Sequence, residues 1–283
     1  MTQPVVSVVL GSYNRRSFLK ATLKSVRNNG MSLPYEIIVV DGGSTDGSLK
    51  YLIAQKDVIT IIQHNRGQFR GKRIERRSWG YFMNLGFKAA QGKYILMISD
   101  DCLLIPGAIE NGVKRFERLL ADGRKVGAMA FYWRDWPGSD TYWVGKTFGR
   151  VFVNHGLYLR EVAAALNGFD EESFHFYHAD GDLCLRMWRE GYEVVDCPDA
   201  YVEHFSHASP RVRASNAEHE RADWEAYSKR WGDLPHDTGS PFIERAYLDP
   251  HRTYRKFPWQ ARALLAVKEL ANSFLRRLGN RDS

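Results

Sequence analysis

The chain has 283 residues, 44% hydrophobic and 26% charged, which is the balance of an ordinary globular protein. It contains no low-complexity run and no repeat of 20 to 50 residues, which excludes disordered and solenoid proteins. No apolar run approaches the roughly 18 residues needed to span a bilayer. The first residues enter an apolar strand without a basic leader, so we expect no signal peptide.

Lysine and arginine number 40 against 33 acidic residues, a formal charge of +7. This excess suits an anionic partner such as a nucleotide diphosphate, a lipid phosphate, an acidic membrane or a nucleic acid. No recognition motif for DNA or RNA accompanies the charge, so we expect no nucleic-acid partner. Cys102, Cys184 and Cys197 show no CxxC spacing. They favour a reducing cytoplasm, with the inner face of the membrane as the alternative location.

The first hundred residues alternate between apolar strands and helices. The elements predicted in chain order are a strand from Val5 to about Asn14, a helix with Leu19, Leu23 and Val26, a strand from Glu36 to Asp41, a helix through Leu49 and Leu52, a strand Val58–Ile62, a helix Ser78–Ala90 and a strand Tyr94–Ile98. Asn14 is predicted to cap the first helix, and Ser44, Thr45 or Asp46 the second. Such alternation predicts a mostly parallel sheet covered by helices on both faces.

The second half follows a less regular pattern. Its predicted elements are a helix Pro106–Leu120, a strand Val126–Trp136, a loop-rich stretch around Trp143, a strand over 151–160, a helix ending at Asn167-Gly168, a helix capped by Asp180 or Asp182 and ending at Gly191, a strand Tyr192–Asp196, a turn opened by Pro198, a helix Ala217–Trp231, an irregular segment Leu234–Pro250 and a final helix Trp259–Leu278.

Polar residues follow each strand of the first half, and the carboxyl ends of parallel strands share one rim of a sheet. The residues expected on this rim are Tyr13, Asn14, Asp41, Asn65, Arg66, Asp100 and Asp101. Ligands of open α/β sheets bind at such a rim. Adjacent carboxylates directly after a buried strand are costly to desolvate without a positive partner. A divalent cation that carries a phosphorylated substrate is one explanation, and two solvated loop aspartates are the other.

Five segments occur in a distinctive order: SVVLGSYNR, EIIVVDGGSTDGS, NRG, NLGFKAAQGKYILMISDDCLLIPGAI and GFDEESFHFYHADGDLCLRMWREGYEVVDCPDAYVEH. Together they resemble the inverting nucleotide-sugar glycosyltransferases of carbohydrate-active family two, over roughly 70% of the chain. The resemblance implies an α/β chain of the GT-A fold, with a Rossmann-like, mostly parallel central sheet flanked by helices. It also implies a nucleotide-sugar half over residues 1–105 and an acceptor half over 106–215, followed by a helical C-terminal extension over 216–283.

The resemblance places the donor against eight residues: Ser12, Tyr13, Asn14, Asp41, Asn65, Arg66, Ser99 and Asp100. Asp41 would accept the imide N–H of uracil or a donor on a purine edge, and Tyr13 would stack on the base. For Asp41 the alternative is a turn-forming side chain ahead of two glycines. For Asn65 and Arg66 the alternative is a surface loop.

Ser99-Asp100-Asp101 stands where the family has Asp-x-Asp, and Ser99 departs from that pattern because it brings no charge to a metal. The resemblance therefore implies Asp101 and His204 as ligands of Mn²⁺ or Mg²⁺, with the imidazole favouring Mn²⁺. His207 is a weaker candidate. A solvated or core histidine is the alternative interpretation of His204.

Asp180 matches the catalytic base of the family's Glu-Asp pair, although Ala179 replaces the glutamate. Asp182 is the alternative base, in which case Asp180 only caps the helix. The implied reaction moves a sugar from a UDP-, GDP- or dTDP-linked donor to a hydroxyl of a glycan or glycolipid, with inversion and metal assistance. The two departures, Ser99 and Ala179, leave a second hypothesis open: a catalytically silent protein that binds nucleotide sugars.

Three further segments remain open. The basic insertion from Phe69 to Tyr81 could hold the diphosphate or an anionic acceptor, or could be a solvated face. The basic amphipathic helix predicted at the C-terminal end could lie on an anionic membrane, pack on its own domain or join a second subunit as a homodimer. Aromatic residues from Trp133 to Trp143 could form a sugar-stacking wall or part of the core.

Overall fold

A computed structural model provides the fold, and it describes residues 3–135, 141–205, 210–235 and 239–246, with the single residues 259 and 263. The predicted final helix falls almost wholly outside these residues, as does His207. None of the helices described is both long enough and apolar enough to cross a membrane.

Four apolar strands form the parallel part of the sheet. They are β1 (Val6–Ser12), β2 (Tyr35–Asp41), β3 (Val58–Ile62) and β6 (Tyr94–Met97), in the spatial order β3-β2-β1-β6. Val8 of β1 lies between Ile37 and Leu96, so this strand is paired along both edges. Strands buried on both faces are apolar throughout rather than alternating, which explains the continuous runs in the sequence. The edge strand β3 is the exception, because Ile59 and Ile62 are exposed.

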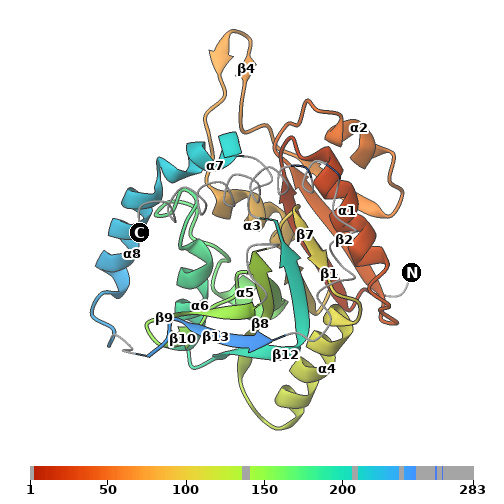
Figure 1. Ribbon diagram of the computed structural model, residues 1–283. Coiled ribbons are helices and arrows are strands. Elements are labelled where there is room, and N and C mark those ends of the chain that lie inside the picture. Colours follow the sequence, from red (N-terminus) through yellow and green to blue (C-terminus); the bar gives the residue numbers. More distant parts are fainter. Residues whose placement is uncertain are drawn as a thin grey trace, which may run out of the picture.

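Helices cover this part of the sheet as predicted (Figure 1). They are α1 (Arg16–Arg27), α2 (Ser48–Ile53) and α3 (Trp79–Ala89), whereas α4 (Ala108–Ala121) packs mainly on strands of the second half. Helix α1 buries Leu19, Leu23 and Val26, three residues at the spacing of one helix face. Ser78 caps α3 by accepting the backbone N–H of Tyr81.

The predicted cap at Asn14 is wrong. Arg15 is the residue that precedes α1, and its side chain makes no capping hydrogen bond. Asn14 has a φ of 52°, in the left-handed region that asparagine tolerates, and its Oδ1 accepts the N–H of Thr45 at 2.7 Å. The side chain therefore ties the loop after β1 to the loop after β2. At α2 the residue that precedes the helix is Gly47, which has no side chain to cap it, and Asp46 contributes from one residue earlier by accepting the N–H of Ser48 on Oδ1.

The second half extends the sheet with strands of mixed direction (Figure 1). They are β7 (Cys102–Leu104), β8 (Val126–Asp135), β9 (Thr141–Thr147), β10 (Arg150–Val151), β11 (Gly156–Leu159), β12 (Glu193–His204) and β13 (Phe242–Ala246). Strand β11 is antiparallel to both β6 and β8 and so joins the two halves into one sheet. The chain continues through α5 (Arg160–Ala165), α6 (Ala179–Arg189), α7 (Pro210–Ala217) and α8 (Glu220–Trp231).

Two strands were mispredicted as loop. β9 includes Trp143, which lies opposite Trp133 of β8, and β13 pairs with β9 in the segment expected to be irregular. Strand β9 contains a glycine, which weakens the sequence signal for a strand. Strand β13 has mostly exposed side chains and no apolar face, so only its pairing with β9 defines it as a strand.

Pro198 does not open a turn but lies inside β12. The register of β12 against β8 shifts between Cys197 and Tyr201. A proline lacks the N–H that a sheet requires and is tolerated in a strand at such an irregularity. After the shift the strand continues to His204, which pairs with Cys102 of β7.

A two-stranded arm projects from the body between β3 and α3 (Figure 1). It consists of β4 (Gln68–Phe69) and β5 (Lys72–Arg73), which pair only with each other. We call residues 67–74 the β4–β5 arm.

Candidate functional site

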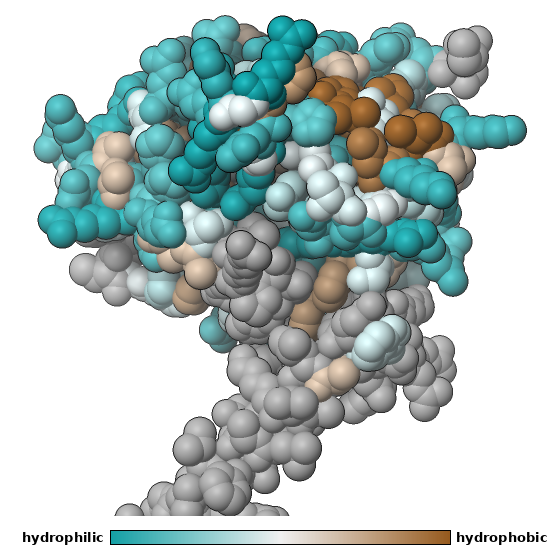
Figure 2. Space-filling view, turned by 90° about the horizontal axis from the view of Figure 1, so that it is seen from above, coloured by the Kyte–Doolittle hydropathy of each residue, from teal (hydrophilic) through white to brown (hydrophobic). Residues whose placement is uncertain are grey.

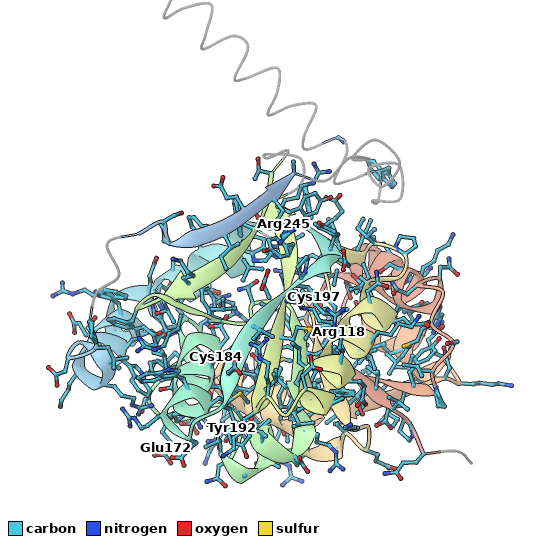
Figure 3. All side chains as sticks on the ribbon, turned by 90° about the horizontal axis from the view of Figure 1, so that it is seen from below. Arg118, Glu172, Cys184, Tyr192, Cys197 and Arg245 are labelled. Atoms are coloured by element: carbon cyan, nitrogen blue, oxygen red, sulfur yellow. The ribbon has the colours of Figure 1, made fainter. Side chains whose placement is uncertain are left out.

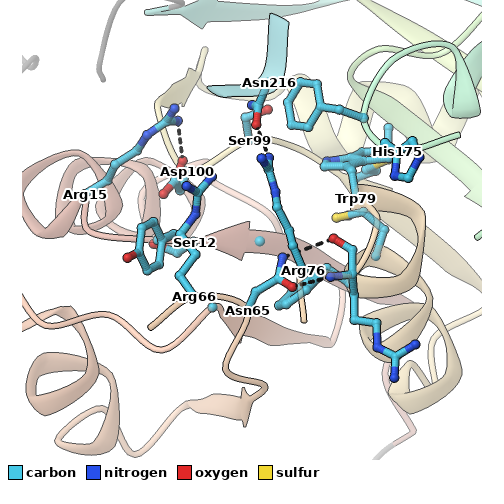
Figure 4. A pocket seen from close by; sticks show the side chains of 18 of the residues that line it. Ser12, Arg15, Asn65, Arg66, Arg76, Trp79, Ser99, Asp100, His175 and Asn216 are labelled. Atoms are coloured by element: carbon cyan, nitrogen blue, oxygen red, sulfur yellow. Dashed lines mark hydrogen bonds and ion pairs between the residues drawn. The ribbon is translucent and has the colours of Figure 1, made fainter. Parts of the chain in front are cut away.

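A cavity opens at the carboxyl ends of β1, β2 and β6 (Figure 4). The parallel strands bring the loops after them to one rim, as the sequence predicted. Six of the predicted donor-binding residues line the cavity: Ser12, Tyr13, Asn65, Arg66, Ser99 and Asp100. Asn14 and Asp41 do not line it.

Arg15 connects the two carboxylates after β6. Its Nη1 lies 2.9 Å from Asp100 Oδ1 and 2.8 Å from Asp101 Oδ2, and both aspartates are buried. Thr22 of α1 donates from Oγ1 to the backbone oxygens of Asp100 and Cys102, each at 2.8 Å, and so fixes the turn that presents the pair. Burial lowers the pKa of Arg15, but the two carboxylates outweigh this effect and raise it. Arg15 is therefore a permanent cation beside the acidic pair.

The two aspartates differ in how easily they ionise. Burial raises the pKa of Asp100 against the influence of Arg15. For Asp101 burial acts in the same direction, but the charges of His204 and Arg15 outweigh it and lower the pKa. Asp101 is therefore the carboxylate better able to offer a full negative charge to a ligand.

Each carboxylate keeps one oxygen that Arg15 does not use. Asp100 Oδ2 and Asp101 Oδ1 are buried and accept no hydrogen bond within the described residues. His204 Nε2 lies 3.4 Å from Asp101 Oδ1, and His204 Nδ1 lies 3.6 Å from Asp135 Oδ1. Unpaired carboxylate oxygens beside an imidazole suit a divalent cation such as Mn²⁺. The residues present therefore fit the predicted metal.

A second group of potential ligands surrounds the same histidine. Ligand atoms of Cys102, His155 and His204 lie within 4.8 Å of one another. Burial raises the pKa of the Cys102 thiol and lowers that of the His155 imidazolium, so both are neutral near pH 7. Trp133 packs edge-on against both histidines. Trp133 therefore packs against His204 and against the hydrophobic core, which favours the core interpretation over a sugar-stacking wall for this residue.

The opposite wall of the cavity is basic. Arg66, together with Arg76 and Arg77 of the insertion, lines it. Burial lowers the pKa of Arg76, and the neighbouring charge of Arg66 lowers it further. Arg76 donates to the side chain of Asn216 in α7, as Figure 4 shows, and Arg66 donates to Ser215 Oγ at 3.1 Å. Two cations that lie together without a carboxylate between them suit an anionic ligand.

Asn65 and Asp41 use their side chains within the protein. The amide of Asn65 accepts the backbone N–H of Arg77 at 2.5 Å and donates to the Arg77 carbonyl at 3.2 Å, which closes the base of the insertion. Asp41 Oδ1 accepts the N–H groups of Gly43 and Ser44 at 2.9 and 2.7 Å. Its Oδ2 is buried without a hydrogen bond in the described part of the chain. The turn-forming role considered for Asp41 is therefore present, and base recognition stays a prediction.

Asp180 lies next to the cavity at the start of α6. Its Oδ2 is 3.4 Å from the side-chain nitrogen of Asn154, a residue that lines the cavity, and its Oδ1 accepts the N–H of Gly181. Burial raises the pKa of Asp180 above its ordinary value. A carboxylate with a raised pKa is a better proton acceptor, which suits a general base.

Asp182, the alternative base, is fully buried and occupied by other groups. It accepts hydrogen bonds from Arg186 at 2.8 Å, Arg230 at 2.8 Å and Trp231 at 3.0 Å, which join α6 to α8. This arrangement favours Asp180 as the base and gives Asp182 a structural role.

We expect Asp182→Ala to lower the free energy of unfolding by about 2 kcal/mol, because it removes the acceptor of the buried Trp231 N–H and breaks the pairs with Arg186 and Arg230. Urea unfolding followed by circular dichroism measures the change. Glu190→Ala, at the exposed end of the same helix, should stay within about 0.5 kcal/mol of the parent chain. Equal stability of the Asp182 variant and the parent would contradict this role.

Asp170 anchors the turn before α6 to α8 in a pH-dependent way. Burial raises its pKa, but hydrogen bonds from Ser173, Arg230 and Glu172 outweigh burial and lower it to about 2. The unfolded carboxyl titrates near pH 4. The stabilisation is therefore complete above about pH 4 and is lost as the pH falls toward 2. We expect Asp170→Asn to be less stable than the parent at pH 6, and the gap in urea midpoint to shrink below pH 4. A gap that does not change with pH would contradict this.

Residues 7–167 match the family model described as Glycosyl transferase family 2, which spans more than half of the chain. The uncharacterized glycosyltransferase YwdF of Bacillus subtilis is 31% identical over 271 residues, covering 90% of this chain and 95% of that protein. The chain spans 28% of the Sinorhizobium fredii protein y4gI, at 24% identity, and 30% of the Bacillus subtilis protein EpsH, at 30% identity.

Solved structures share the fold. The mannosyltransferase PcManGT from Pyrobaculum calidifontis, in complex with GDP-Man and Mn²⁺, has a TM-score of 0.57 at 19% identity and aligns over 83% of this chain and 66% of its own. TarS of S. aureus, in complex with UDP, has a TM-score of 0.50 at 14% identity, over 80% of this chain and 72% of its own. At these identities the likeness establishes the architecture, a mixed α/β sheet flanked by helices, and confirms the predicted GT-A fold.

Proposed function

The chain belongs to glycosyl transferase family 2, and we propose that it moves a sugar from a nucleotide-diphosphate donor to a hydroxyl of a glycan or glycolipid, with inversion and metal assistance. The observation that carries this proposal is one cavity that Asp100 lines together with Arg15, Arg66 and Arg76. Asp101 shares Arg15 with Asp100, and Asp180 contacts Asn154 of the cavity lining. PcManGT was solved with GDP-Man and Mn²⁺ and TarS with UDP, which supports a nucleotide-sugar donor here.

In this proposal the nucleotide binds along the carboxyl ends of β1 and β2. Tyr13 offers its ring to the base, while Arg66 lies 5.2 Å from that ring and can reach the diphosphate. Asp41 is buried and does not line the cavity, so it shapes the turn beside the base through the N–H groups of Gly43 and Ser44, and its contact with the base stays a prediction. Ser12, Asn14, Asn65 and Ser99 shape the backbone around the nucleotide, and Asp100 contacts the ribose or the sugar.

The cation site comprises Asp101 and His204. A bound Mn²⁺ or Mg²⁺ would neutralise charge on the departing diphosphate. The chain's own contribution is Arg15, which stays charged and holds both carboxylates in place, together with Arg66 and Arg76 on the opposite wall. Because Ser99 supplies no charge, the metal site is weaker than one built on two aspartates of an Asp-x-Asp motif.

Asp180 is the proposed general base. It takes the proton from the acceptor hydroxyl while that oxygen attacks the anomeric carbon from the face opposite the nucleotide, and the bond from that carbon to the diphosphate oxygen breaks. Asn154 orients the carboxylate through its contact with Oδ2. The acceptor binds on the side of residues 106–215, and the extension from residue 216 supplies Asn216 to the cavity.

The test is a donor panel. UDP-, GDP- and dTDP-linked sugars are incubated with the full chain and Mn²⁺, and release of the nucleotide diphosphate is followed with and without glycan and glycolipid acceptors. Binding of one nucleotide diphosphate together with acceptor-dependent release supports the proposal. Binding without release across the panel would favour the second candidate, a silent nucleotide-sugar-binding protein, for which Ser99 and Ala179 are the motivating residues. Absence of nucleotide binding would contradict both.

A further inference from the structure

The β4–β5 arm presents an unusual combination of side chains at its tip. Residues 67–73 are all exposed, and Phe69 leaves 67% of its surface in contact with solvent. The arm stands out from the body and packs on no other strand (Figure 1). A large aromatic ring at an exposed tip contributes nothing to the core and is available to contact a surface outside the folded chain.

The turn of the arm holds Arg70 in a backbone conformation that is unfavourable for most residues with a side chain. Arg70 and Gly71 form the two-residue turn, with φ of 50° and 76°. Turns with two positive φ values favour asparagine followed by glycine, and arginine is disfavoured at the first position. The Arg70 guanidinium lies 5.3 Å from the centre of the Phe69 ring, so ring and charge are presented together. A strained residue at an exposed tip is a reason to look for a binding role.

The charges of the arm are unpaired. Arg70, Lys72 and Arg73 take part in no ion pair with any described residue, and Glu75, the acid of this segment, pairs with Arg77 at 3.8 Å. Such side chains are available to anions outside the protein. Cations beside an exposed aromatic ring are the combination that binds the surface of an anionic bilayer, where phosphates meet the charges and the ring enters the interface.

Exposed apolar side chains also occur on two elements that precede the arm in the chain. Ile53 of α2 and Ile59 and Ile62 of β3 are exposed by 68%, 43% and 44%. Figure 2 views the side from which the arm projects and shows hydrophobic side chains gathered in one part of the molecule. A soluble polyanion would need only the charges, whereas a membrane also rewards burial of the exposed aromatic ring.

We propose that the β4–β5 arm docks the protein on an anionic lipid surface, with Phe69 among the headgroups and Arg70, Lys72 and Arg73 against lipid phosphates. Arg66, Arg76 and Arg77 at the base of the arm line the cavity, so docking holds the cavity near the membrane. That consequence suits a lipid-linked acceptor and rests on the proposed function, but the docking itself does not.

The test is sedimentation of the full chain with vesicles of phosphatidylcholine alone or with 30% phosphatidylglycerol (roughly the anionic content of an acidic leaflet). The test variant is Arg70→Asn/Lys72→Gln/Arg73→Gln, which removes three charges while Asn-Gly favours the same turn. Its control, Lys114→Gln/Arg118→Gln/Lys125→Gln, removes three exposed charges from α4 and the loop after it. Arg118 is visible from the opposite side of the molecule in Figure 3.

We expect the parent and the control to bind only the anionic vesicles, and the arm variant to bind them about a hundredfold more weakly. Phe69→Ser should weaken binding about tenfold, including at salt concentrations that screen the charges. Nucleotide binding measured without vesicles should not change in any variant, which separates this test from that of the proposed function. The proposal is overturned if the parent does not bind anionic vesicles, or if the arm variant binds as the control does.

Discussion

Asp180→Asn is expected to reduce sugar transfer on the order of a hundredfold or more while leaving donor affinity unchanged. The amide cannot accept the acceptor's proton, yet it matches the shape of the carboxylate and keeps an oxygen for the N–H of Gly181. Rates of transfer under saturating donor, together with calorimetric binding of the nucleotide diphosphate, measure the two quantities.

Asn154→Ala is the matched variant for this experiment. It leaves the base in place but removes the contact at 3.4 Å that orients Asp180 Oδ2, so we expect a smaller loss, about tenfold. Near-normal transfer by Asp180→Asn would remove Asp180 from its role. An unfolded variant would be recognised from its circular dichroism before any kinetic comparison.

Asp101→Asn is expected to abolish the tightening of nucleotide binding by Mn²⁺. The substitution removes the full charge and replaces one of the two carboxylate oxygens, of which Oδ1 lies 3.4 Å from His204 Nε2, with an NH2 group that cannot bind a metal. Titration of the nucleotide diphosphate with and without Mn²⁺ gives the metal-dependent difference, and binding of Mn²⁺ alone, followed by its paramagnetic resonance, gives a second readout. Metal-dependent tightening that survives in this variant would contradict the assigned site.

Arg15→Gln provides the opposite control for the metal site. Removing the cation that bridges Asp100 and Asp101 eliminates repulsion toward an incoming metal, so Mn²⁺ should bind the free protein more tightly, by about tenfold. The same variant should be less stable without metal, because two buried carboxylates lose their counter-ion. Weaker Mn²⁺ binding in this variant would mean that Arg15 organises the site instead of competing for it.

Local patterns predicted the parallel half of the fold because each element there carries its own signal. Continuous apolar runs such as that of β2, and the amphipathic face of α1, depend on neighbouring residues alone. Strand β13 carries no such signal. It is mostly exposed, and only its pairing with β9, about a hundred residues earlier in the chain, defines it.

The same distinction applies to the site. Residues at strand ends, such as Tyr13 and Asp100, were predicted because parallel strands bring their ends together. Arg15 was missed, since its partner Asp100 is 85 residues away and nothing near Arg15 indicates it. The sequence does indicate that Asp100 and Asp101 need a positive partner, because none stands near them in the chain, but it does not identify Arg15 as that partner. The sequence does not distinguish Asp182 from Asp180, because only tertiary contacts separate a buried structural carboxylate from one beside a cavity.

The register shift in β12 determines on which face of the sheet the later side chains of the strand lie. Side chains alternate between the two faces of a sheet, and the irregularity from Cys197 to Tyr201 sets which face His204 occupies. Deleting one residue there would keep most of the strand pairing but would turn each later side chain of the strand to the opposite face of the sheet. The imidazole of His204 would then point away from Asp101. A single-residue deletion in this short stretch would thus separate His204 from Asp101 without removing either side chain.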